Sequence, residues 1–164
     1  MAGAAYVVFD GDNDKWAYAY LNGWKTNKKI DFDYENAHDL DTMTGRAQDE
    51  QYVKSKLRER MRKSTAVIVL VGEKTKNLYK YVRWELELAL ELGLPIIAAN
   101  LNGSNRQDDD RCPAIIRDKG SVVHIPYKLV ALKHAMTNWR SEFNGLSLAD
   151  KTGGARYYSQ FDAA

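Results

Sequence analysis

Short runs of apolar residues alternate along the chain with segments in which apolar residues recur every three or four positions. The apolar runs predict strands at residues 5–9, 30–33, 65–71, 94–99 and 121–125. The periodic segments predict helices at residues 14–24, 49–63, 78–92 and 127–143. Strands that alternate with helices favour right-handed crossovers and a parallel sheet covered on both faces. We therefore expect an α/β fold of the flavodoxin-like type, with three layers and a five-stranded parallel sheet of order 2-1-3-4-5.

Three stretches lack this pattern. Residues 34–48 are polar and predict a loop longer than most connections in compact domains, a length that hints at function. The polar run 100–111 predicts a second loop, whose acidic residues are expected to be solvated: Asp108, Asp109 and Asp110. Residues 146–164 show little periodicity. We therefore expect one domain over residues 1–145 and a C-terminal extension over 146–164, either an extended tail or a segment that docks a partner.

Composition narrows the class of protein further. The chain has 164 residues, and its 28% charged and 45% hydrophobic residues are typical of a soluble globular domain. The formal net charge of +2 gives no reason to expect a nucleic-acid partner. Cys112 is the single cysteine, which excludes an internal disulfide and favours a reducing compartment. No basic signal sequence opens the chain and no apolar run is long enough to span a membrane, so we expect a cytoplasmic protein.

Acidic residues follow the first predicted strand directly. The segment 7–14 reads VVFDGDND and ends in Asp10, Asp12 and Asp14, which could be metal ligands, an acid pair or the polar edge of a pocket. In a flavodoxin-like sheet, ligands bind beyond the carboxyl ends of the strands, where strands 1 and 3 lie side by side. The loop after strand 1, the turn 72–77 and the first turns of the next helix should therefore meet. Asp14 is expected to cap the helix that follows it.

One glutamate on the third predicted helix lies on the apolar side. At about 100° per residue, Leu86, Ala89 and Leu90 mark the buried centre of that helix. Glu85 falls inside this apolar arc, whereas Glu87 and Glu91 fall on the opposite side. A carboxylate among apolar side chains costs several kcal/mol unless it is paired or faces a cavity. A structural salt bridge, a rim position from which the carboxylate reaches water, or a functional acid would explain Glu85, and its place after strand 3 favours function.

Several metal and nucleophile chemistries do not fit the sequence. A haloacid-dehalogenase-type phosphatase also begins with an Asp-x-Asp strand end, but it requires a Ser or Thr after the next core strand, where this chain has Gly72. A phosphoacceptor receiver requires an aspartate there. The histidines have no partners at zinc-ligand spacing, and nucleophile signatures are absent. His124 is expected to pack in the core. What remains is a metal-free pocket with one semi-buried carboxylate, which suits cleavage of an N-glycosidic bond.

The segment YVRWELELALELGLPIIAANLNG resembles the third helix and fourth strand of TIR-like domains. In that family an aromatic residue precedes the catalytic glutamate of an E-L-x-x-A pattern by four positions, as Tyr81 precedes Glu85 here, followed by Leu86 and Ala89. The segments YVVFDGDNDKWAYAYLNGW and RMRKSTAVIVLVGEKT resemble the prokaryotic subgroup that includes the signal-producing subunit of Thoeris anti-phage systems. The first loop departs from the family, because many TIR domains carry Ser or Tyr before the acid.

The resemblance implies an enzyme that consumes NAD⁺ as its substrate, with no cofactor and no metal. Glu85 would be catalytic, and the residues implied to bind substrate are Phe9, Asp10 and Tyr81, with Asp12, Asn13 and Lys74 added by topology. The product would be a cyclic ADP-ribose-type signal or free ADP-ribose. Self-assembly into a homo-oligomer and a separate effector reached by the diffusible nucleotide are also implied. Two other hypotheses stay open: a non-enzymatic TIR-like assembly module and a nucleoside deoxyribosyltransferase-like enzyme.

Overall fold

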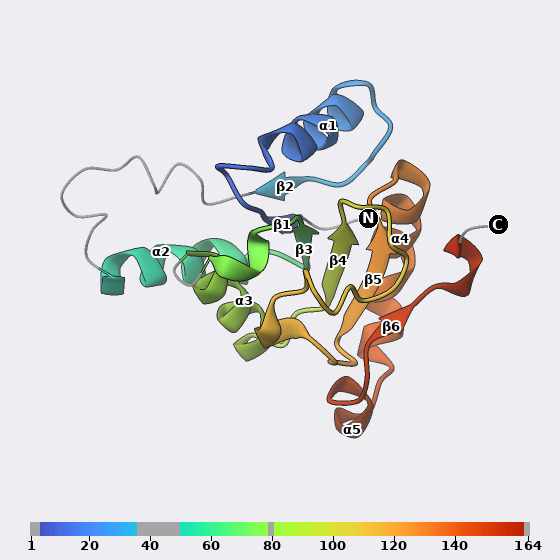
Figure 1. Ribbon diagram of the computed structural model, residues 1–164. Coiled ribbons are helices and arrows are strands. Elements are labelled where there is room, and N and C mark those ends of the chain that lie inside the picture. Colours follow the sequence, from blue (N-terminus) through green and yellow to red (C-terminus); the bar gives the residue numbers. More distant parts are fainter. Residues whose placement is uncertain (1–3, 36–49, 79–80, 163–164) are drawn as a thin grey trace.

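A parallel sheet runs through the middle of the protein in the computed structural model, which describes residues 4–35, 50–78 and 81–162 (Figure 1). The strands are β1 (Ala5–Val8), β2 (Tyr34–Glu35), β3 (Ala66–Val71), β4 (Ile96–Asn100), β5 (Val122–Pro126) and β6 (Arg156–Tyr157). Their order is β2-β1-β3-β4-β5-β6, and all neighbours are parallel. The predicted flavodoxin-like fold and its order 2-1-3-4-5 are confirmed, and β6 extends the sheet beyond β5.

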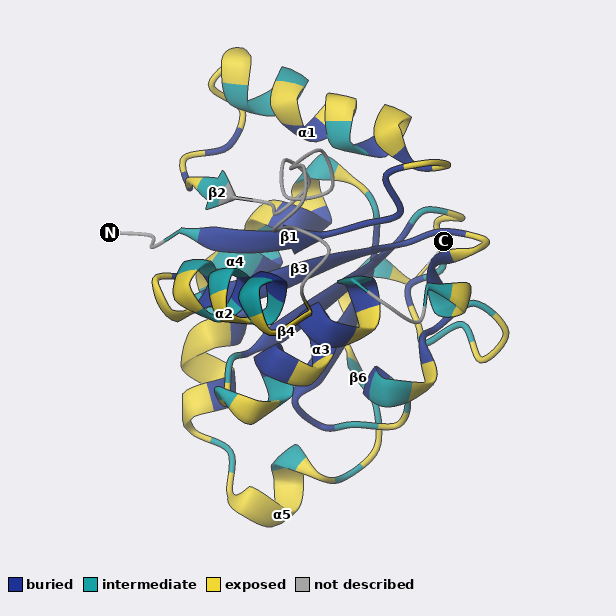
Figure 2. Cartoon of the chain, turned by 90° about the vertical axis from the view of Figure 1, so that its left-hand side faces the viewer, coloured by how far each residue is buried: buried dark blue, intermediate teal, exposed yellow. Residues whose placement is uncertain are grey.

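Helices cover both faces of the sheet and make three layers (Figures 1 and 2). The helices are α1 (Lys15–Thr26), α2 (Glu50–Arg62), α3 (Tyr81–Glu91), α4 (Leu129–Asn144) and the short α5 (Leu148–Lys151). The helices α2 and α3 pack on one face, and α1 and α4 on the other. Figure 2 shows the strands as buried and the outer sides of the helices as exposed. Both faces of β3 are buried, as expected for the central strand of a doubly covered parallel sheet.

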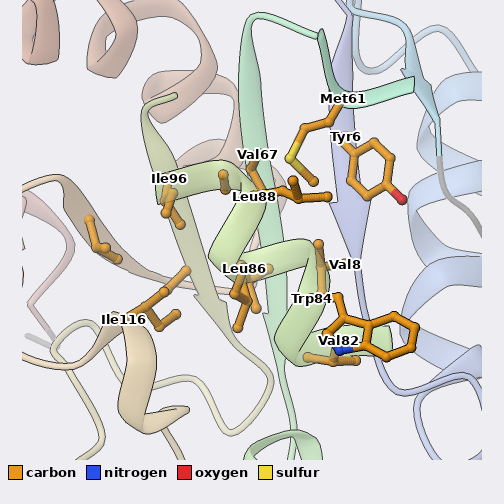
Figure 3. Close-up of a cluster of buried hydrophobic side chains, with 14 of the residues drawn as sticks. Tyr6, Val8, Met61, Val67, Val82, Trp84, Leu86, Leu88, Ile96 and Ile116 are labelled. Atoms are coloured by element: carbon orange, nitrogen blue, oxygen red, sulfur yellow. The ribbon is translucent and has the colours of Figure 1, made fainter. Parts of the chain in front are cut away.

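The helix α3 lies against the sheet through most of the apolar positions that the helical wheel predicts, although Leu90, expected at the buried centre, is only partly buried. Leu86, Leu88 and Ala89 are buried, and they gather with Val8 and Val67 in one cluster (Figure 3). Each fully buried Leu or Val of this kind stabilises the fold by roughly 1.5–3 kcal/mol. The burial of this stripe fixes the rotation of α3 about its axis, and with it the direction of every other side chain on the helix.

The second strand lies later in the chain than the pattern predicts. Ile30 and Phe32 are buried, as their alternation requires, but neither belongs to a strand. The backbone pairing with β1 begins only where Tyr34 lies opposite Ala5. Alternation reports which side chains face the core, whereas a strand also requires a neighbouring backbone in register. The predicted loop 34–48 therefore starts with a strand, and its residues after Glu35 lie outside the described ones.

The C-terminal segment packs along the β5 edge of the sheet. Arg156 pairs with Val123 in the β6–β5 ladder. Asn105 Nδ2 donates to the carbonyl oxygen of Tyr158 at 2.7 Å, and the side chain of Arg106 forms an ion pair of 3.1 Å with Asp162. These contacts join the described part of the extension to the loop after β4. The domain boundary at residue 145 stays a prediction. In the described ranges, no helix has both the length and the apolar character that a membrane crossing requires.

His124 lies in β5 and is a packed core residue, as predicted. Its side chain is fully buried (0% exposed), and neither ring nitrogen has a hydrogen-bond partner among the described residues. Burial lowers the pKa of His124 to about 4, although the Asp118 and Asp109 carboxylates act to raise it. The folded protein therefore favours the neutral ring, whereas the unfolded chain binds a proton near pH 6.5.

This difference in pKa predicts a loss of stability in mild acid. Because the folded pKa lies below the unfolded one, the stabilisation is complete above about pH 6.5 and is lost as the pH falls toward 4. Between pH 7.5 and 5, His124 should cost about 2 kcal/mol of unfolding free energy. Urea denaturation at several pH values, compared between wild type and His124→Leu, measures this effect. The variant should show a flatter pH dependence, and parallel curves for the two proteins would contradict the prediction.

Candidate functional site

The carboxyl ends of β1 and β3 lie side by side, and the chain leaves them toward opposite faces of the sheet. β1 pairs with β3 from Ala5 opposite Ala66 to Val8 opposite Val69. The chain then continues from β1 into α1 on one face, and from β3 toward α3 on the other. Such a divergence opens a crevice between the two following loops, which is where doubly wound folds bind ligands.

Asp10 organises the loop after β1. Its side chain is 1% exposed, and its Oδ1 accepts hydrogen bonds from the backbone N–H groups of Asp12 and Asn13 at 2.9 and 3.2 Å. Its Oδ2 accepts a hydrogen bond from Nδ2 of Asn13 at 2.7 Å. Both carboxylate oxygens are thus used to fold the loop, while the side chains of Asp12 and Asn13 are exposed. Within the described ranges, no three acidic, His or Cys side chains are grouped as metal ligands would be.

Asp14 lies at the N-cap position of α1. The prediction that its side chain caps the helix is wrong, because the side chain makes no capping hydrogen bond. The carboxyl group is buried against Gly72, in the turn after β3, so closely that a Cβ atom at Gly72 would overlap it. Burial, and then the neighbouring Asp10 carboxylate, raise the pKa of Asp14, while Arg111 and Thr75 act to lower it. A contact between two loops has replaced the local cap, because only glycine leaves room there for the carboxyl group.

A pocket of about 320 Å³ opens at this edge of the sheet. We call it the carboxyl-end pocket. It is lined by Asn13, Asp14, Trp16, Gly72, Glu73, Lys74, Leu101 and Arg111. Of the residues predicted from the sequence, Asn13 and Lys74 line it. The sequence analysis did not predict three other lining residues, which are Trp16, Leu101 and Arg111. The signal available for the last two is that parallel strands end at one edge of the sheet, so the loop after β4 lies close to the loops after β1 and β3.

Arg111 reaches the pocket because the loop after β4 is held in a defined shape. Asp108 Oδ1 accepts hydrogen bonds from the backbone N–H groups of Asp110 and Arg111, each at 3.0 Å. Asn102 Nδ2 donates to the other carboxylate oxygen of Asp108 at 2.8 Å. Although burial acts to raise it, these hydrogen bonds hold the pKa of Asp108 below its ordinary value. The sequence predicted that Asp108 would simply be solvated. In the structure it instead accepts hydrogen bonds that shape the turn.

The predicted catalytic glutamate lies on the opposite face of the sheet from α1. Glu85 is buried with 6% of its surface exposed, whereas Glu87 and Glu91 of the same helix are exposed, as predicted. Glu85 is not without an interaction partner in the folded protein. Tyr81 is half-buried one turn earlier and packs against Trp84, with ring centroids 5.5 Å apart. Neither Glu85 nor Tyr81 is among the described residues that line the carboxyl-end pocket.

Phe9 is buried at the end of β1. Its ring stacks on that of Tyr18 from α1, with centroids 4.7 Å apart and an interplanar angle of 8°. Phe9 therefore packs on the α1 side of the sheet, and the predicted site residues divide into two groups. The first, on the α1 side and at the strand ends, contains Phe9, Asp10, Asp12, Asn13 and Lys74, and the second, on α3, contains Tyr81 and Glu85.

A parallel sheet of this order, covered by helices on both faces, is consistent with the flavodoxin-like fold of TIR-like domains. A family model described as Thoeris protein ThsB, TIR-like domain, matches residues 6–106, which is more than half of the chain. The chain therefore belongs to this family of Thoeris TIR-like domains and is a TIR-like defence protein. No curated protein matches the sequence.

The contact between Asp14 and Gly72 predicts a specific pair of stability effects. Gly72→Ala should destabilise the protein by about 1–3 kcal/mol, because the added methyl group displaces a buried carboxyl group. Gly154→Ala is the matched control, since nothing lies within 4 Å of the added atom there. In the double variant Asp14→Ser/Gly72→Ala, the alanine should lower the free energy of unfolding much less. The serine side chain is smaller than that of Asp14 and leaves room for the added methyl group. Urea denaturation of the single and double variants measures this coupling, and additive effects would exclude the contact.

Proposed function

We propose that this protein cleaves the bond between nicotinamide and ribose in NAD⁺ and makes a cyclic ADP-ribose-type signal in anti-phage defence. The observation that carries the proposal is the burial of Glu85 on the second turn of α3, where a glutamate on an apolar face has a high cost in free energy. The motif formed by Tyr81, Glu85, Leu86 and Ala89 supports the same role, since the spacing matches that of catalytic TIR-like domains.

The chemistry requires a negative group beside the reacting ribose. As the bond between C1′ and the nicotinamide nitrogen breaks, its electron pair leaves with nicotinamide and the ribose becomes an oxocarbenium ion. A carboxylate in a poorly solvated site stabilises this cation more strongly than the same group in water would. A hydroxyl group or ring nitrogen of the same ADP-ribose then attacks C1′ and gives a cyclic product, and attack by water gives ADP-ribose. In this proposal NAD⁺ is the substrate, and neither a metal nor a further cofactor takes part.

The remaining site residues have supporting roles in this proposal. Phe9, Asp10 and Tyr81 border the nucleotide site, and Asp12, Asn13 and Lys74 lie near it. Asp10 acts through the loop, because both of its oxygens already accept hydrogen bonds from Asp12 and Asn13. The enzyme assembles with copies of itself in the cytoplasm, and its diffusible product reaches a separate effector protein.

Replacing Glu85 by glutamine tests the central role. Glu85→Gln keeps the size of the side chain and removes its charge, so release of nicotinamide from NAD⁺ should fall by roughly 10²-fold or more. Glu87→Gln is the matched control, because this exposed glutamate of the same helix pairs with Arg83 at 2.8 Å. It should retain wild-type activity. Nicotinamide is measured by chromatography, with concentrated protein so that self-assembly is not limiting.

The same assay separates the alternatives. If Glu85→Gln releases nicotinamide as fast as wild type, Glu85 has no part in the reaction. An assembly module would release none under any condition, including extracts from infected cells. A deoxyribosyltransferase would leave NAD⁺ intact and move deoxyribose between free bases.

A further inference from the structure

Two cationic side chains line the carboxyl-end pocket, and neither belongs to a salt bridge within the part of the chain that the structure describes. Lys74 comes from the turn after β3, and Arg111 from the loop after β4. Neither side chain forms a salt bridge or a hydrogen bond with any residue of the described ranges. Lys74 is exposed and Arg111 is half-buried, so both are accessible from the pocket. Unpaired cations from separate loops that converge on one cavity are the usual arrangement for binding an anion.

A nearby ion pair ties the two loops together. Lys76, two residues after Lys74, donates to the backbone oxygen of Asp110 at 2.5 Å and pairs with its carboxylate at 3.3 Å. Asp110 directly precedes Arg111, whose backbone is also held by Asp108. The contact with Lys76 joins the turn that carries Lys74 to the loop that carries Arg111, and both cations line the same pocket. Such a link between loops lowers the entropy cost of binding.

The acids that line the pocket form no salt bridge with these cations in the described ranges. Glu73 is exposed. Asp14 is buried against Gly72, and its Oδ2 is shielded from solvent and has no hydrogen-bond partner among the described residues. Burial raises the pKa of Asp14, and the positive charge of Arg111 acts to lower it. Neither acid lies within salt-bridge distance of Lys74 or Arg111 among the described residues.

An aromatic surface completes the pocket. Trp16 lines it from the first turn of α1 and is 49% exposed, which is unusual for a residue of this size. Its ring has an edge contact with Tyr20, with centroids 6.0 Å apart. Exposed aromatic rings beside cationic groups bind nucleotides by stacking on the base while the cations contact the phosphates.

We infer that the carboxyl-end pocket binds the diphosphate and adenine of an adenine nucleotide, with Lys74 and Arg111 on the phosphates and Trp16 beside the base. The pocket volume of about 320 Å³ is at the small end of the range for ligand sites, so it suits one nucleotide and not a whole dinucleotide. The inference rests on the proposed function in taking this nucleotide as the ADP half of NAD⁺. Lys74 and Arg111 are binding residues here, separate from the catalytic role of Glu85.

Binding of ADP tests the inference without any turnover, because ADP lacks the nicotinamide bond. Isothermal titration at low ionic strength should show that Arg111→Gln and Lys74→Gln each weaken ADP binding roughly 10- to 100-fold. The affinity for adenosine, which has no phosphate, should stay the same. Arg62→Gln is the matched control, because this exposed arginine lies at the end of α2, and it should bind ADP as wild type does. Trp16→Ala should weaken ADP and adenosine alike.

The results separate this inference from the proposed function. Equal ADP affinity in Arg111→Gln, Lys74→Gln and Arg62→Gln would overturn the diphosphate site, whatever the nicotinamide assay gives. Failure of wild type to bind ADP at millimolar concentration would overturn it as well. Glu85→Gln should bind ADP normally. If that variant also cleaved NAD⁺ normally, the proposed catalytic role would fail while the diphosphate site remained.

Discussion

The parallel pairing of β1 with β3 is the contact on which the arrangement of this protein depends. The two strands are buried along their whole length and lie in register from Ala5 opposite Ala66 to Val8 opposite Val69. Because they are parallel, their carboxyl ends meet at one edge. Because the chain then turns toward opposite faces, the loops that follow them diverge. The crevice follows from this pairing, and the carboxyl-end pocket lies at the same edge, where the loop after β4 adds Leu101 and Arg111 to its lining.

Buried acids hold the edge of the sheet in shape. A carboxylate loses several kcal/mol of hydration when it is buried, so it persists only where other groups compensate it. Asp10 is compensated by hydrogen bonds from its own loop, and Asp14 lies in a space that exists because residue 72 is glycine. The buried acids at this edge of the sheet are therefore held by contacts within the protein. Lys74 and Arg111 differ from these acids, because they line the pocket and form no salt bridge with any described residue.

The two halves of the candidate site differ in how far the sequence could predict them. The burial of Glu85 was predictable, because the side of a helix on which a residue lies depends only on spacing to its near neighbours. Asn13 and Lys74 were predictable from topology alone. Arg111 was not, because its loop has no periodicity. That loop is shaped by hydrogen bonds to Asp108 and contacts the turn after β3 through Lys76 and Asp110, which are 34 residues apart. Asp14 was placed correctly at the helix start, but a long-range contact directs its side chain elsewhere.

The sequence by itself determined the parallel α/β class, the order of the first five strands, the buried side of α3 and the resemblance to TIR-like domains. These features follow from local spacing and from the few connections that a twisted parallel sheet allows. Tertiary structure decided the start of β2 at Tyr34, the docking of the C-terminal strand, the contact of Asp14 with Gly72 and the convergence of Lys74 with Arg111. Each of these depends on backbone or side-chain atoms from distant segments meeting in space, and the pattern within a single segment carries no information about such a meeting.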